Sequence, residues 1–185
     1  MTRRPTPLTT DEVVRAARSI IETRGIEACS MRTLATELGI QPPALYRRVS
    51  NKDELLTLVL ADALADVEVP TAGPWQECMA FLMRRLRTLM RRHPYLLTLY
   101  LDGHLRLDDG LTMQKRAIAP LLEAGFDPEA AGSAVTVLSM YTLGMTSIAT
   151  SLEVDDDALF EFGLALIIDG LAKGDTWTTS KPSSS

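Results

Sequence analysis

The sequence predicts an all-α protein built from a small N-terminal head and a longer helical body. Helix-capping signals recur along the 185 residues, whereas the alternation of apolar and polar residues that is typical of strands is nearly absent. Apolar residues make up 46% of the chain and charged residues 23%, a composition that favours a packed core over disorder. We expect a head over residues 1–50, a connecting helix over 52–67, a body over 68–174 and a disordered tail over 175–185.

The first helix of the head is expected to begin at a capping box. Thr9 is placed to accept a bond from the Glu12 backbone, and the Glu12 side chain is placed to return one to Thr9. An apolar stripe of helical period follows until Gly25, which ends the helix. Ser30 caps a short second helix, and another capping box at 51–54 opens the longer fourth helix.

Gly39 separates the second and third short helices, and this spacing is typical of a helix-turn-helix. Glycine adopts the left-handed conformation that ends one helix and redirects the chain. Ala35 is small enough for close helix approach, and Ile40 is expected to fill the turn. Pro42 and Pro43 fit only a first helical turn, so the third helix begins there. In such a motif the third helix enters the major groove of DNA.

Proline and glycine separate the helices of the body. Asp127-Pro128-Glu129 combines a cap, a proline suited to the first turn and an acid favoured by the helix dipole. Pro120 lies inside an otherwise helical stretch and predicts a kink there. The expected helices cover residues 75–92, 95–101, 109–124, 128–152 and 155–174.

The head carries the runs RTLA at 32–35, LGI at 38–40, PALY at 43–46 and VSNKDELL at 49–56. With these residues and their spacing, about residues 9–67 resemble the DNA-binding domain of the tetracycline-repressor (TetR) family. The run FEFGLALIIDGL at 160–171 is similar to the last helix of one subgroup of that family. The resemblance implies an all-helical homodimer that binds operator DNA with its head and a small molecule with its body.

The resemblance also assigns DNA contacts to individual residues. It implies phosphate contacts for Tyr46 and Lys52 and a weaker one for Thr33. Arginine suits a bidentate contact to guanine, whereas alanine and proline offer only apolar contact. The alternatives are that Tyr46 is a packed aromatic residue and that the arginines form an ordinary solvated face. The positions that face base edges or the flanking backbone are Arg32, Pro42, Pro43, Ala44, Arg47 and Arg48.

The charge of the chain is unevenly distributed, although its net value is −5. Residues 1–55 hold nine Lys/Arg against seven Asp/Glu, a net +2, and the remainder holds ten against seventeen, a net −7. A mildly basic head on an acidic body favours one orientation toward DNA. Arg3 and Arg4 either add a basic arm or form a passive terminus.

We expect the effector to bind among the helices of residues 75–150. Methionine-rich surfaces with scattered aromatic side chains suit adaptable, largely apolar ligand sites. The alternative is that these residues are ordinary core. His93 is expected to end a helix, whereas His104 lies in a loop and is a candidate ligand contact. The candidates are Met83, Leu86, Met90, Tyr95, Leu99, Tyr100, His104, Met113, Leu138, Tyr141 and Met145.

Residues 130–152 carry no charge, which raises the question of a membrane span. Eight Ser/Thr within the stretch and acidic residues at both ends argue against one. A helix without a polar face in a soluble protein must be buried on nearly every side. We therefore expect homodimerisation through two helices, 128–152 and 156–173, with no membrane partner.

Five arginines on the 75–92 helix oppose an apolar stripe. We expect this basic surface to be a solvated face, and a second nucleic-acid surface is the alternative. The residues are Arg84, Arg85, Arg87, Arg91 and Arg92.

The sequence predicts a DNA-binding regulator and not an enzyme. Signatures of nucleophilic, phosphate-binding or paired-histidine metal sites are missing from it, and no cofactor or metal is expected. Cys29 and Cys78 are two distant thiols and residues 1–7 show no apolar leader, which favours the cytoplasm. We expect a repressor that binds a palindromic operator and is released by a small molecule. A ligand-responsive activator, a ligand-independent regulator and a helical adaptor remain as alternatives.

Overall fold

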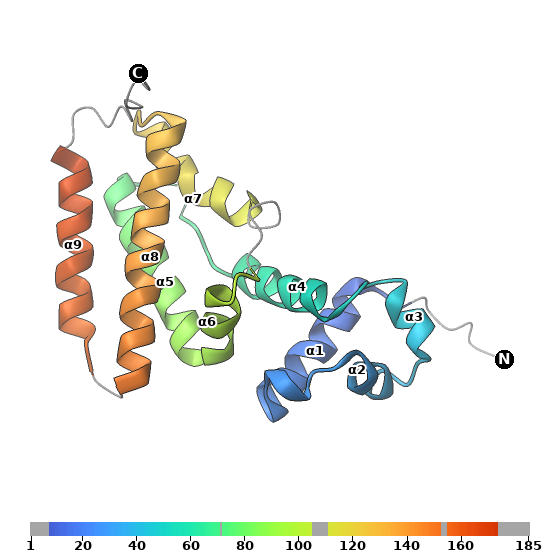
Figure 1. Cartoon of the computed structure of the whole chain (residues 1–185). Coiled ribbons are helices and arrows are strands. Elements are labelled where there is room, and N and C mark those ends of the chain that lie inside the picture. Colours follow the sequence, from blue (N-terminus) through green and yellow to red (C-terminus); the bar gives the residue numbers. More distant parts are fainter. Residues whose placement is uncertain (1–7, 71, 105–110, 153–154, 174–185) are drawn as a thin grey trace, which may run out of the picture. The chain divides into compact units, whose positions relative to one another are not determined.

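The regular structure of this protein is entirely helical in the part that can be described (Figure 1). A computed structural model describes residues 8–70, 72–104, 111–152 and 155–173. Within those ranges the all-α prediction is confirmed. The helices are α1 Thr10–Arg24, η1 Ile26–Ala28, α2 Met31–Glu37, α3 Pro42–Tyr46, α4 Lys52–Ala65, α5 Trp75–Arg92, α6 Pro94–Leu101, α7 Leu111–Glu123, α8 Pro128–Leu152 and α9 Asp157–Lys173.

The chain divides into two compact units, each with its own internal contacts. The head unit consists of the described residues up to 64 together with 93–104, so it contains α1 to α4 and also α6. The body unit consists of the described residues 65–92 and 111–173, and it contains α5, α7, α8 and α9. The expected arm at Arg3 and Arg4 and the tail over 175–185 lie outside the described residues.

The capping signals of the head form as expected. The Glu12 amide donates to Thr9 Oγ1 at 3.2 Å, and the Thr9 amide donates to Glu12 Oε2 at 2.8 Å. Gly25 ends α1 with a φ of +85°. The buried face of α1, which includes Val13, Ala17 and Ile20, belongs to the core of the head. The local rules for helix ends therefore determine this part of the fold.

The turn between α2 and α3 has the geometry that a helix-turn-helix requires. Gly39 adopts a φ of +63°, and the Ile40 amide donates to the Ala35 carbonyl at 3.0 Å. Helix α1 packs on α2, and α2 packs on α3. Leu45 and Val49 are fully buried and anchor α3 and the segment after it. The sequence pattern predicts that the third helix runs on through Val49, whereas α3 ends at Tyr46.

Helix α5 is at the centre of the body unit. It contacts α7, α8 and α9, while α8 contacts α7 and α9. Met79, Leu82 and Met90 of α5 are buried, as are Leu138 of α8 and Phe160 of α9. Helix α7 continues through Pro120, and the expected kink there stays a prediction.

Helices α8 and α9 leave large apolar side chains uncovered within one chain. Helix α8 is long and apolar enough to cross a membrane by length and composition, and about a third of its most apolar window (33%) is buried. Such a single helix is weak evidence for a span, and α8 packs against α5, α7 and α9. The exposed side chains are Val137, Met140, Ile148 and Leu152 of α8 and Leu159, Phe162 and Leu166 of α9.

The basic surface of α5 is the solvated face that was expected at four of its positions, but not at Arg87; the exposed residues are Arg84, Arg85, Arg91 and Arg92. Arg87 is only 5% exposed, forms an ion pair with Asp156 and lies 3.0 Å from Asp157 Oδ1. Its guanidinium carbon also lies 4.2 Å from the Phe160 ring centroid. Arg84 binds both carboxylate oxygens of Glu161, at 2.8 and 2.6 Å. The prediction was wrong for Arg87 because its partners come from the start of α9, which no local pattern reveals.

Candidate nucleic-acid interface and effector region

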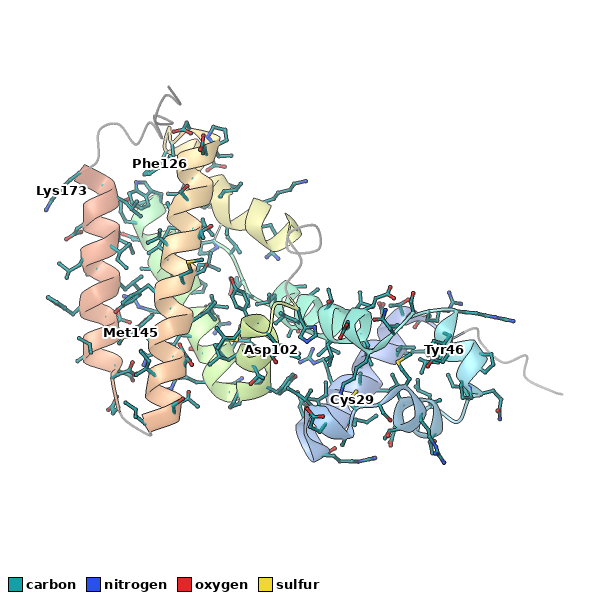
Figure 2. All side chains as sticks on the ribbon, in the orientation of Figure 1. Cys29, Tyr46, Asp102, Phe126, Met145 and Lys173 are labelled. Atoms are coloured by element: carbon teal, nitrogen blue, oxygen red, sulfur yellow. The ribbon has the colours of Figure 1, made fainter. Side chains whose placement is uncertain are left out.

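The expected DNA-contacting residues lie on α2, on α3, in the segment directly after α3 and at the first residue of α4. Tyr46 is 51% exposed, and Figure 2 shows it at the end of α3 in the head unit. Thr33, Ala44 and Lys52 are half-buried. The remaining expected contacts, Arg32, Pro42, Pro43, Arg47 and Arg48, are all exposed.

The burial of Leu45 and Val49 explains why the neighbouring side chains are available. These two residues turn one side of α3 into the core, so the opposite side faces outward. Tyr46 makes no hydrogen bond within the described ranges, so the alternative of a packed aromatic finds no support there. Arg47 and Arg48 likewise form no ion pair with any described residue. Exposed arginines without partners are suited to phosphates and base edges.

Thr33 has a local partner that the sequence pattern implied. Its amide donates to Ser30 Oγ at 3.1 Å, and the two side-chain oxygens are 2.8 Å apart. This is the N-cap of α2. A direct phosphate contact by the Thr33 hydroxyl would therefore share that group with Ser30.

The expected effector residues are divided between the two units. Tyr95, Leu99, Tyr100 and His104 belong to the head unit, on or just after α6. Met113 lies on α7, but its side chain is outside the described part. The others lie on α5 and α8, which pack on each other. Of these, Met83, Leu86, Met90 and Leu138 are buried, while Tyr141 and Met145 are half-buried.

Tyr141 of α8 contacts α9 through both its hydroxyl and its ring. Its hydroxyl donates to the Phe160 carbonyl at 3.0 Å and to the Leu159 carbonyl at 3.2 Å. Its ring stacks on Phe160 with centroids 5.7 Å apart, and burial raises the pKa of its hydroxyl. A Cβ at Gly163 would overlap the Tyr141 hydroxyl, so a larger residue there would require the tyrosine side chain to move. Sequence reasoning missed this contact between α8 and α9.

Tyr95 and His93 both contact Glu22 of α1 inside the head unit. The Tyr95 hydroxyl donates to Glu22 Oε1 at 3.1 Å, and His93 Nδ1 lies 3.4 Å from the same oxygen. Burial, followed by the negative charge of Glu22, raises the pKa of Tyr95 to about 12. Arg18, also on α1, binds Asp62 of α4 at 2.6 Å. In the sequence Glu22 looks like an ordinary surface acid of an amphipathic helix, so no pattern singles it out.

An apolar groove of about 270 Å³ lies between α8 and α9. None of the expected effector residues lines it. Its lining includes small side chains of α8 and Gly170 of α9, whose positions were the signal available in the sequence. It is lined by Phe126, Ala130, Ser133, Ala134, Val137, Leu166, Ile167, Gly170 and Leu171.

The described residues contain no group of three or more His, Cys, Asp or Glu side chains that could hold a metal ion. Cys29 and Cys78 are buried free thiols. Burial raises the pKa of both, which keeps them protonated and unreactive.

Comparison with known families identifies both parts of the chain. Residues 13–59 match the family of bacterial regulatory proteins called tetR, and residues 69–155 match the tetracyclin repressor-like C-terminal domain. The chain belongs to the TetR family. This is a family of regulatory proteins and not of enzymes. Its membership confirms the predicted fold, a helix-turn-helix head followed by a helical TetR-like body.

Named relatives agree with this assignment. The chain is 30% identical to the class A tetracycline repressor of transposon 1721 from Escherichia coli, over 91% of this chain and 92% of that protein. It is 33% identical to an HTH-type transcriptional regulator of Saccharopolyspora erythraea over 82% of this chain, and 34% identical to the HTH-type transcriptional repressor DrrR1 of Streptomyces coeruleorubidus over 77%. The matched part spans only 65% and 54% of those two relatives.

Solved structures of other proteins share the fold. ActR of Streptomyces coelicolor in complex with actinorhodin superposes with a TM-score of 0.79 at 30% identity, covering 91% of this chain and 99% of that one. BioQ with its double-stranded DNA operator superposes with a TM-score of 0.72, also at 30% identity, covering 90% and 99%. The fold of this chain is therefore one that relatives use with operator DNA and with a small molecule.

Proposed function

We propose that this TetR-family protein is a transcriptional repressor that binds a palindromic operator as a homodimer and is released by a small-molecule effector. The observation that carries the proposal is the outward side of α3, where Tyr46, Arg47 and Arg48 are exposed on a helix-turn-helix scaffold. The operator complex of BioQ supports the DNA target. The names of DrrR1 and the tetracycline repressors support repression as the sign of regulation.

The homodimer is supported by the exposed apolar side chains of α8 and α9. Contiguous apolar surface of this kind usually marks an interface. The groove between the two helices continues this surface, since Val137 and Leu166 belong to both. A two-fold interface would present two recognition helices about 34 Å apart, the spacing of successive major grooves. We therefore propose that α8 and α9 pair with the same helices of a second copy.

The effector is proposed to bind in the body unit. The supporting observations are the buried methionines Met83 and Met90 on α5 and the neighbouring Leu138 and Met145 on α8. The related structures hold actinorhodin in ActR and minocycline in a TetR variant of Acinetobacter baumannii. By analogy the ligand is a largely apolar, ring-containing molecule. It would release DNA by binding more tightly to the state that binds the operator poorly.

A cytoplasmic location completes the proposal. Its target is DNA, and Cys29 and Cys78 are free thiols suited to a reducing compartment.

Selection of the full chain against random duplex DNA tests this function. We expect enrichment of a palindrome. Binding of that duplex is then measured for Arg47→Ala. Removal of the Arg47 side chain should weaken binding by about tenfold or more. The matched control is Lys115→Ala, which removes one exposed cation of α7 in the body unit. Equal affinities for the two variants would contradict the assignment of α3 as the reading helix.

A further inference from the structure

The first three residues of α3 offer no free hydrogen-bond donor to a DNA base. Pro42 and Pro43 form its first turn and carry no backbone N–H. The Ala44 amide already donates to the Gln41 carbonyl at 2.9 Å, and its side chain is a methyl group. In a helix-turn-helix, the N-terminal residues of this helix are the ones that usually contact base edges. In this chain those positions provide bases with apolar contact only.

The helical turn continues past the end of α3, and this determines the directions of the two arginines that follow. Arg47 has right-handed helical φ and ψ angles of −74° and −13°, and the Val49 amide donates to the Leu45 carbonyl at 3.1 Å. Leu45 and Val49 are 0% and 1% exposed, so they mark the side that faces the core. At 3.6 residues per turn, Arg47 lies about 200° from Leu45, almost opposite the core. Arg48 lies only about 60° from Leu45, at the flank of the exposed side.

The Arg47 guanidinium has the chemistry to select one base. It forms no hydrogen bond or ion pair with any described residue, so its N–H donors are available. Two of these donors match the O6 and N7 acceptors of guanine, and guanine is the base that presents two acceptors in the major groove. Gln41, which directly precedes α3 and is exposed, carries an amide that matches adenine instead. The outward direction and the free guanidinium of Arg47 together point to a guanine.

We infer that Arg47 is the residue of this surface that determines sequence specificity, and that each operator half-site presents a guanine to it in the major groove. Arg48, at the flank, contacts the phosphate backbone instead. The inference rests on the proposed function and names the base that the protein selects. The two adjacent arginines therefore differ in role. Loss of Arg47 changes which sequences are preferred, whereas loss of Arg48 weakens binding of all sequences by a similar factor.

Replacement of single guanines by 7-deazaguanine, in the duplex recovered by selection, tests the inference. This analogue pairs with cytosine as guanine does but lacks the N7 acceptor. For the full-length wild type, we expect one guanine in each half-site at which the replacement weakens binding by about five- to fiftyfold. In Arg47→Ala the replacement at that guanine should cause no further loss, because the side chain that donates to N7 has been removed.

Arg48→Ala is the matched control, since it removes the same charge from the next exposed residue. Its affinity should depend less on salt, by about one unit of the log–log slope per protomer, while the loss caused by 7-deazaguanine persists. A selected duplex in which no guanine shows a loss that depends on Arg47 would overturn the inference and leave operator binding intact. A folded wild type that enriches no duplex at all would overturn both the inference and the proposed function.

Discussion

Arg87 is a charged side chain that the fold of the body unit almost completely buries. Its guanidinium pairs with Asp156 and lies over the Phe160 ring. Its Nε atom and Asp156 Oδ2 have no hydrogen-bond partner within the described ranges. A buried charge that loses its partner is costly, whereas an exposed pair contributes little. Arg87 and Arg84, one helical turn apart on α5, should therefore differ sharply in their contribution to the free energy of unfolding.

Replacing Arg87 by methionine should destabilise the protein by about 3–5 kcal/mol, because Asp156 is left buried without a counter-charge. The same change at Arg84, whose pair with Glu161 is about half exposed, should cost no more than about 1 kcal/mol. The free energy of unfolding in urea measures both. Similar values for the two variants would show that the Arg87–Asp156 pair is not buried in solution.

The buried hydroxyl of Tyr95 should make the free energy of unfolding depend on pH in the alkaline range. Burial and Glu22 raise the pKa of its hydroxyl to about 12, above the value of about 10 expected in the unfolded chain. The resulting stabilisation is complete below about pH 10 and is lost as the pH rises toward about 12. Relative to Tyr95→Phe, the wild type should lose unfolding free energy only in that window. A difference that stays constant to pH 12 would contradict the raised pKa.

At the scale of helices, local signals predicted more than long-range ones could. The ends of α1 and α5 were predicted within a residue, because caps, prolines and glycines act on their own turn of chain. The partners of Arg87 and Tyr95 were not predicted. Those bonds join residues 69 and 73 positions apart, and no periodicity of one helix encodes a partner on another.

The candidate site divides in the same way. The exposed residues of α3 can be predicted from the local sequence pattern, because Leu45 and Val49 determine which side of the helix is buried. The residues of the effector region depend on how helices meet, so a methionine that packs in the core and one that lines a ligand site look alike in sequence. Their assignment to the effector stays a prediction.

The exposed apolar side chains of α8 and α9 lead to a prediction about the oligomeric state. Phe162→Glu places a charge where 62% of the residue is exposed in one chain, and it should convert the proposed dimer to a folded monomer. Leu122→Glu on α7, 41% exposed, is the control and should leave the dimer intact. Sedimentation equilibrium gives both masses. A Phe162→Glu protein that remains dimeric would place the interface elsewhere.

At the scale of the whole molecule, the proposed function combines a DNA-reading head with an effector-binding body. Net charge does not reveal this function, since the full chain carries −5 and the basic residues of the motif are a small part of it. Membership of the TetR family and the geometry of α2 and α3 carry the argument instead. Sequence-selective, salt-sensitive DNA binding is therefore the most direct consequence of the proposed function.

The measurement that tests this central claim is the dissociation constant of the full-length protein for the selected duplex and for a scrambled duplex, over a series of salt concentrations. If the protein is an operator-binding regulator, its affinity falls steeply with salt, because counterions are released from the phosphates, and it prefers the selected duplex by about a thousandfold or more. Equal affinity for the two duplexes, from a folded dimer, would contradict it.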